Sequence, residues 1–118
     1  MLFAAVAMAS AADYNIKKYG AVSDTTKYST KALQKAIDAC SKAGGGRVVV
    51  PAGNYKIGSI LLKSNVHLHL ELGATLYGST HIEDYTPYAT DFKSLRTQGT
   101  TVQLIYGDKV ENVVIDGY

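Results

Sequence analysis

The sequence predicts a mainly β fold, in which short strands coil around a narrow core and one helix closes the N-terminal end of the coil. Three observations predict it: brief apolar runs separated by Gly, Pro, Asn or Ser, strict alternation in one run, and one amphipathic helix directly before them. The runs are rich in Val, Ile, Leu and Tyr, which suit a pleated, half-buried surface, and none approaches helix length. They cover residues 47–50, 55–57, 60–62, 66–72 and 74–77.

Apolar and polar residues alternate strictly in residues 66–72. Successive side chains of a strand point to opposite faces, so this run has one apolar and one polar face. The apolar face would carry Val66, Leu68, Leu70 and Leu72, and the polar face would carry His67, His69 and Glu71. Such a strand belongs to a sheet that buries one face only.

Residues 29–43 have the spacing of an amphipathic helix. One stripe carries Leu33, Ala36, Ile37 and Cys40 at positions i, i+3, i+4 and i+7. Ser29 or Thr30 can cap its start by accepting a bond from a free backbone N–H, and residues 44–46, all Gly, end it. The open end of a coil of strands needs a cover, and we expect this helix to plug it.

The rest of the chain adds strands to the same plan. Residues 13–19 are a plausible first strand, and residues 79–100 form a long polar loop around Pro87. Alternation returns at Val102, Leu104 and Tyr106, and again at Val113 and Ile115. Residues 64–68 and 111–115 share the order polar, Asn, Val, any residue, large aliphatic. This echo suggests a solenoid of repeated strand units.

Composition narrows the function classes. The chain has 118 residues, a formal net charge of +2 and no basic run, so we expect no nucleic-acid partner. One cysteine, Cys40, excludes a disulfide within the chain. Residues 1–11 resemble the end of a secretory signal peptide, so we expect a secreted or periplasmic protein that leaves the membrane once this segment is removed.

Candidate catalytic and metal-binding residues are few. Glu83 and Asp84 form the one adjacent pair of acids, in a polar loop where solvation is the simpler explanation. His67, His69 and Glu71 can in principle hold a transition metal, but along one strand they lie about 7 Å apart. A polar outer face explains them equally well, so we assign no metal ligand.

Several other residues can be given a functional role, but a purely structural role explains each of them more simply. Residues 44–46 precede a strand rather than a helix, the reverse of the order that binds phosphate. Cys40 lies on the apolar stripe, as a structural cysteine does. Tyr85 and Tyr88 can stack on a sugar ring and Arg96 can face a carboxylate, although ordinary loop packing explains all three.

Several segments together resemble the polygalacturonase-like glycoside hydrolases of family 28. The matching segments are residues 14–16 (YNI) and 19–21 (YGA), 32–40 (ALQKAIDAC), 44–51 (GGGRVVVP), 52–55 (AGNY), 62–66 (LKSNV) and 72–79 (LGATLYGS). The resemblance runs from Tyr14 to Gly117. Ser23, Asp24 and Thr25 stand where the family has Gly-Asp-Gly, a departure confined to a loop.

The resemblance implies a right-handed parallel β-helix with an N-terminal capping helix. It also implies hydrolysis of glycosidic bonds in pectin-like polyuronides, without a cofactor and by a monomer. The family's catalytic signatures, Asn-Thr-Asp, Asp-Asp, Gly-His-Gly and Arg-Ile-Lys, do not occur in residues 1–118. We therefore expect residues 12–118 to be the N-terminal portion of one β-helix domain, inactive alone. The alternatives are a β-helix polysaccharide lyase and a non-catalytic carbohydrate-binding or structural segment.

Overall fold

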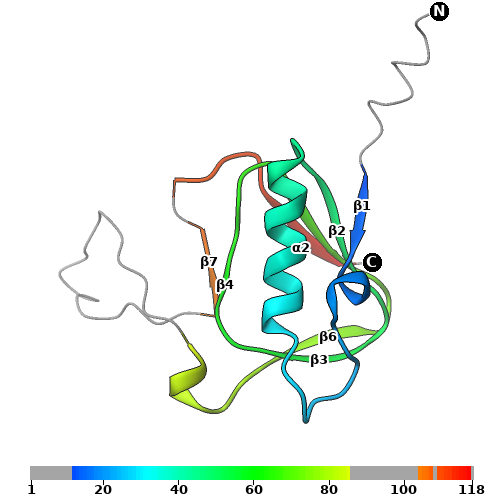
Figure 1. Cartoon of the computed structure of the whole chain (residues 1–118), viewed down its shortest axis with the longest axis vertical. Helices are drawn as coiled ribbons and strands as arrows, with labels where there is room; N and C mark the ends of the chain where they lie inside the picture. The colour runs from blue at the N-terminus through cyan, green and yellow to red at the C-terminus, as the bar shows by residue number, and fades with distance from the viewer. Residues whose placement is uncertain (1–11, 86–103, 108, 118) are drawn as a thin grey trace, which may run out of the picture.

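A computed structural model describes residues 12–85, 104–107 and 109–117 (Figure 1). The strands are β1 (Asp13–Asn15), β2 (Gly46–Val50), β3 (Gly53–Ile57), β4 (Ile60–Leu61), β5 (Val66–Leu70), β6 (Ala74–Gly78), β7 (Ile105–Tyr106) and β8 (Val114–Gly117). The helix α2 (Thr30–Lys42) is joined by two 3-10 turns, η1 (Ile16–Tyr19) and η2 (Ile82–Asp84).

The described strands form three sheets, and each named pair is parallel. One sheet has the order β1-β2-β5-β8, and the other two are the pairs β3-β6 and β4-β7. The chain visits the three sheets in turn, so β2, β3 and β4 make one turn of a coil and β5, β6 and β7 the next. The fold is a parallel β-helix, and antiparallel hairpins, which would contradict the prediction, do not occur among these pairs.

The weak internal repeat marks the rise from one turn to the next. His67 pairs with Val114, and Leu68 pairs with Ile115. The side-chain nitrogen Nδ2 of Asn112 donates a hydrogen bond to the side-chain oxygen Oδ1 of Asn65, 47 residues earlier, at 3.0 Å. Asn65 and Asn112 have φ angles of 66° and 60°, the left-handed region that Asn tolerates better than most residues. The echo in the sequence therefore corresponds to stacked corners of the coil.

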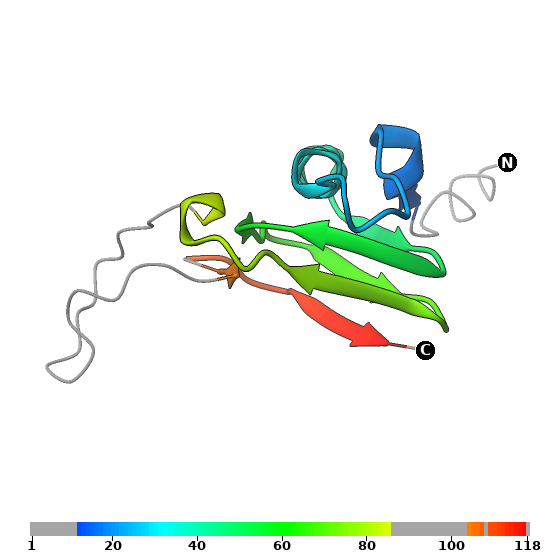
Figure 2. The same ribbon diagram turned by 90° about the horizontal axis from the view of Figure 1, so that it is seen from below.

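Helix α2 lies across one end of the stacked strands, as Figure 2 shows. Its apolar stripe, Leu33, Ala36, Ile37 and Cys40, is fully buried and packs in one core with the inward side chains of the strands, among them Val48, Val50, Tyr55, Ile57 and Leu68. Removing this apolar area from water is the main force that holds the helix on the coil. The prediction of a plug is confirmed.

Side chains of α2 also satisfy backbone groups of the first turn. Thr30 Oγ1 accepts a bond from Gly58 N at 2.8 Å, and Ser41 Oγ donates to Ser64 O at 2.9 Å. The side-chain amide of Gln34 makes two hydrogen bonds with the backbone of Leu61. Its oxygen accepts from Leu61 N at 2.8 Å, and its nitrogen donates to Leu61 O at 2.9 Å. Gln34 thus occupies the place of a neighbouring strand along the edge of β4.

Three details of the sequence prediction are wrong. The strand predicted at residues 13–19 ends at Asn15, because the Asn15 side chain accepts from Lys17 N at 2.9 Å and starts η1. Leu72 is 71% exposed, since β5 ends at Leu70 and the chain turns before β6. Ser29 is at the N-cap position but makes no capping bond, because its hydroxyl bonds the backbone of Val22.

The long polar loop predicted at residues 79–100 lies mostly outside the described residues, as do Val102 and residues 1–11. Its described start contains η2. Within the part of the chain that the structure describes, no helix has the length and apolar character needed to cross a bilayer.

Candidate functional site

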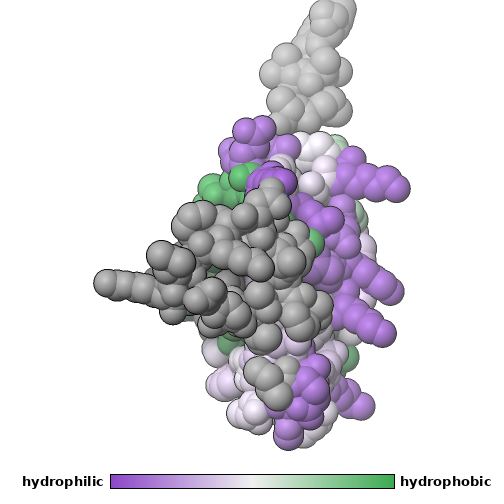
Figure 3. Space-filling model, turned by 90° about the vertical axis from the view of Figure 1, so that its left-hand side faces the viewer, coloured by the Kyte–Doolittle hydropathy of each residue, from purple (hydrophilic) through white to green (hydrophobic). Residues whose placement is uncertain are grey.

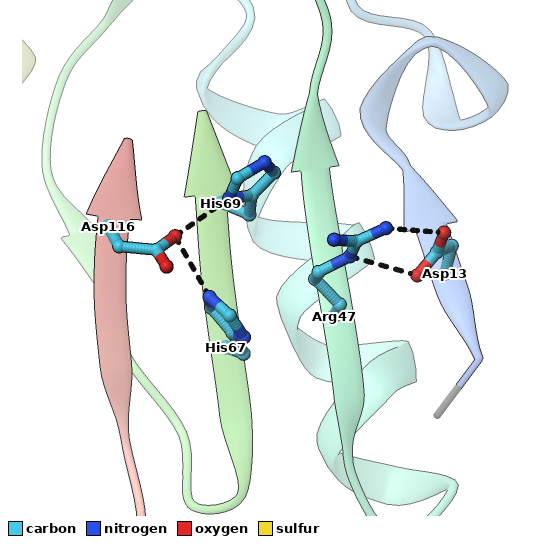
Figure 4. A network of polar contacts seen from close by, with 5 residues as sticks. All are labelled: Asp13, Arg47, His67, His69 and Asp116. Atoms are coloured by element: carbon cyan, nitrogen blue, oxygen red, sulfur yellow. Dashed lines mark hydrogen bonds and ion pairs between the residues drawn. The ribbon is translucent and has the colours of Figure 1, made fainter. Parts of the chain in front are cut away.

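A row of ionisable side chains crosses the outer face of the four-stranded sheet (Figure 4). It consists of Asp13 on β1, Arg47 on β2, His67 and His69 on β5, and Asp116 on β8. The register aligns Asp13, Arg47 and His67 side by side, and it sets Asp116 opposite His69. Parallel in-register stacking therefore brings together residues that are far apart in the sequence.

Asp13 and Arg47 form a two-point ion pair. Arg47 Nε lies 3.1 Å from Asp13 Oδ1, and Nη2 lies 2.9 Å from Oδ2. These bonds favour the charged forms, so the pKa of Asp13 is lowered and that of Arg47 is raised. Both side chains are well exposed, so solvent weakens the pair and its main effect is to orient the guanidinium.

His67 and His69 converge on one carboxylate oxygen. His67 Nε2 lies 2.9 Å and His69 Nδ1 2.7 Å from Asp116 Oδ1. The two rings meet edge to face, with centroids 5.8 Å apart and planes at 83°. The contacts with His69 and then His67 lower the pKa of Asp116. Two imidazoles and a carboxylate thus come together, and one ligand atom from each lies within 4.8 Å of the other two.

Asp116 is the member of this cluster that was not predicted from the sequence, where Glu71 was paired with the two histidines instead. Glu71 is exposed and lies beyond the end of β5. The 47-residue repeat contained the missing signal, since it places Asp116 directly opposite His69. The partner of a strand residue in this fold lies one turn away rather than two residues along the strand.

A groove of about 450 Å³ lies beside the β4-β7 sheet. Its lining consists of Thr30, Lys31, Gln34, Asp38, Ser59, Leu61, Lys63 and Tyr106. Lys63 Nζ lies 3.6 Å from the Asp38 carboxylate. Figure 3 shows hydrophilic side chains protruding along the edge of the molecule where α2 lies. The groove is therefore bordered by side chains of α2 and of the β4-β7 sheet.

The adjacent acids Glu83 and Asp84 have separate roles. Asp84 Oδ2 accepts bonds from the Ser79 and Tyr28 hydroxyls, whereas the Glu83 side chain is 74% exposed. The bonds from Ser79 and Tyr28 lower the pKa of Asp84. Asp84 therefore ties η2 to the loop before α2.

Replacing Asp84 with Asn should make stability less sensitive to acid. Because the folded pKa of Asp84 lies below the ordinary value of an aspartate, its ionised form adds stability above about pH 4, which is lost as pH falls through the folded pKa. Urea midpoints measured from about pH 5 to about pH 2 should therefore fall less steeply in Asp84→Asn than in the wild type. Glu83→Gln, from the same turn, should keep the wild-type slope; equal slopes in all three proteins would contradict this.

The structure shows the surroundings of those candidate aromatic and thiol residues that it describes. The Tyr85 hydroxyl donates to Ser79 O at 2.6 Å, so it serves loop packing. Cys40 is fully buried, and burial raises the pKa of its thiol, which keeps it protonated and unreactive. Gly45 has a φ of 118°, and a Cβ there would lie 2.7 Å from Asn65 O, so the glycine run serves a tight turn. Tyr88 and Arg96 lie outside the described residues.

Fold and surface together define a polar-faced parallel β-helix closed by a helical plug. The family model for rhamnogalacturonase A/epimerase, pectate lyase-like proteins matches residues 14–117, and the chain belongs to this family. The resemblance to family 28 proteins is confirmed, as is the right-handed β-helix that it implied.

The relatives include enzymes with different activities. An exo-poly-alpha-D-galacturonosidase of Dickeya chrysanthemi is 52% identical over 71 residues, which are 60% of this chain and 12% of that protein. Mannuronan C5-epimerase AlgE2 of Azotobacter vinelandii is 36% identical over 108 residues, or 85% of this chain and 10% of that protein. The family 28 exopolygalacturonase of Yersinia enterocolitica superposes with a TM-score of 0.77 at 33% identity, covering 92% of this chain and 20% of that one. The chain thus spans a small part of the length of each.

Proposed function

We propose that this chain is part of a secreted polygalacturonase-type glycoside hydrolase, which cleaves glycosidic bonds in pectin-like polyuronides. The observation that carries the proposal is the 52% identity to an exo-poly-alpha-D-galacturonosidase in a chain with the fold of a family 28 exopolygalacturonase. In this proposal the polysaccharide is the partner, the protein acts as a monomer, and residues 1–11 belong to an export signal.

The described carboxylates support placing the catalytic groups elsewhere. Glycoside hydrolysis needs one carboxylic acid that stays protonated to donate to the leaving oxygen, which requires a raised pKa. The described carboxylates with a shifted pKa are Asp13, Asp24, Asp84 and Asp116, and each shift is downward. Asp91 and Asp108 lie outside the described residues. We therefore assign the acid and its partner carboxylate to further turns of a longer β-helix.

The last described turn fits that assignment. Ile115 lies opposite the fully buried Leu68 and yet is 50% exposed. Apolar side chains on the inner face of a coil are normally covered by the next turn. A further turn stacked on β8 would bury Ile115 and pair the outer edge of that strand.

A second candidate is chemistry on polyuronates other than hydrolysis. The 36% identity to a mannuronan C5-epimerase over 108 residues favours it, and an alginate lyase of Azotobacter vinelandii is 42% identical over 64 residues. These activities share a uronate polymer as substrate and differ in the fate of the sugar ring. The products therefore distinguish them.

The test compares the 118-residue chain with a longer protein that contains it. We expect no release of reducing ends from polygalacturonate by the chain alone, because the catalytic signatures of the family do not occur in residues 1–118. The longer protein should release reducing ends without forming an unsaturated product. Ultraviolet absorption by the product would indicate a lyase, altered C5 configuration by NMR would indicate an epimerase, and binding without change would indicate a non-catalytic module. Appreciable hydrolysis by the chain alone would refute the assignment of the catalytic residues.

A further inference from the structure

We propose that His67, His69 and Asp116 form a binding site for a Zn²⁺-class transition metal on the outer face of the four-stranded sheet. The site would join β5 to β8 and so fasten one turn of the coil to the next. It does not depend on the proposed function, because its evidence is the geometry and chemistry of these three side chains.

The three ligand atoms already lie close to metal-binding separations. Both histidine nitrogens contact the same oxygen of Asp116, at 2.9 Å and 2.7 Å, and one ligand atom from each residue lies within 4.8 Å of the other two. Four ligands at about 2.0–2.1 Å around tetrahedral zinc are separated by about 3.3 Å. Small side-chain rotations thus suffice to place an ion between the three groups.

The parallel coil removes the objection that one strand spreads its side chains too far apart. His67 uses its far nitrogen, Nε2, and His69 its near nitrogen, Nδ1, so the edge-to-face rings direct both toward one point. Asp116 approaches from the neighbouring strand in register with His69. Figure 4 shows the carboxylate reaching toward both rings.

The surrounding charge also suits a cation. Arg47 is the register neighbour of His67 and would repel a metal, but its guanidinium is turned to Asp13 and neutralised by it. Asp116 then supplies a negative charge beside two imidazoles. The three side chains are 37%, 19% and 45% exposed for His67, His69 and Asp116. An ion can enter from solvent, and water can complete the coordination.

The donor set selects the kind of metal. Imidazole nitrogen suits Zn²⁺, Ni²⁺ and Cu²⁺, whereas Ca²⁺ and Mg²⁺ prefer sites built from oxygen ligands. Three protein ligands leave one position of a tetrahedral ion open. We therefore expect Zn²⁺ to bind and a large excess of Ca²⁺ not to displace it.

The test is isothermal titration calorimetry of Zn²⁺ into the untagged 118-residue chain. One equivalent should bind, and His67→Ala, His69→Ala and Asp116→Asn should each weaken binding about tenfold or more. Matched controls are His81→Ala, which removes the third histidine, and Glu71→Gln, which removes the carboxylate just beyond the end of β5. Both should bind Zn²⁺ as the wild type does. Absence of saturable binding, equal affinity in Asp116→Asn, or displacement by Ca²⁺ would overturn the proposal.

Thermal unfolding provides a second readout for the same variants. A ligand that binds only the folded state raises the melting temperature, so Zn²⁺ should stabilise the wild type and both controls. At the same Zn²⁺ concentration it should stabilise the three ligand variants less, and their circular dichroism without metal reports whether each is folded. Equal stabilisation of a folded Asp116→Asn variant would contradict a metal bridge between β5 and β8.

Discussion

Ile37→Ala is expected to lower the free energy of unfolding by about 2–5 kcal/mol, the range for truncating a large buried aliphatic side chain. Ile37 is fully buried at the middle of the apolar stripe of α2, so truncation leaves a cavity between the helix and the first turn of the coil. Urea unfolding of the 118-residue chain, followed by circular dichroism, measures the effect.

Lys35→Ala is the matched control for this prediction. Lys35 is on the same helix and exposed, and alanine is the better helix former, so the change should stay within about 0.5 kcal/mol. If Ile37→Ala is no more destabilising than Lys35→Ala, the helix does not seal the coil. A loss confined to α2, with the strands still protected from hydrogen exchange, would show that the coil does not need its plug.

The coil and its plug were predictable because each rests on a local pattern. Residues 66–72 alternate, and in the structure Val66 and Leu68 face the core while His67 and His69 face outward. The stripe on residues 33–40 identified the buried face of α2. Period-2 and period-3.6 patterns report which side chains are buried, and burial dominates the stability of both elements.

The ends of the elements were predicted less well, because single hydrogen bonds decide them. The residues on both sides of Asn15 are compatible with a longer strand. The Asn15 side chain instead accepts a bond from Lys17 N and starts a 3-10 turn. Leu72 continues the alternation in sequence, but Ala74 N donates to Glu71 O and the chain has already turned. The spacing of apolar residues does not report such local hydrogen bonds, so it cannot predict where they end a strand.

The His67–His69–Asp116 cluster was missed for a different reason. Its members come from consecutive turns, so their proximity depends on the exact number of residues per turn. The Asn65–Asn112 echo was visible and defines that number, but the outer-face residues were compared only along their own strand. Asp116 comes four residues after Asn112, and His69 comes four residues after Asn65. The repeat therefore places Asp116 opposite His69.

Gln34→Leu should lower the free energy of unfolding by about 2–4 kcal/mol, although the side chain is polar and only half-buried. The change leaves both Leu61 N–H and Leu61 C=O without the partners they have at 2.8 Å and 2.9 Å. Each unsatisfied backbone group costs about 1–3 kcal/mol. Gln34 and Leu61 both line the groove beside β4, so water can reach the freed Leu61 groups and replace part of the lost hydrogen bonding. The total cost should therefore stay below the sum of two full penalties.

Hydrogen exchange separates this mechanism from a general loss of stability. The Leu61 amide should exchange faster in Gln34→Leu even under conditions where the core amides of β2 and β5 keep their protection. Asp38→Ala is the control, since it removes the exposed contacts of Asp38 with Gln34 and Lys63 and leaves the bonds to β4 in place. Its cost should stay below about 1 kcal/mol. Unchanged protection of the Leu61 amide in Gln34→Leu would mean that the glutamine does not cover the edge of β4.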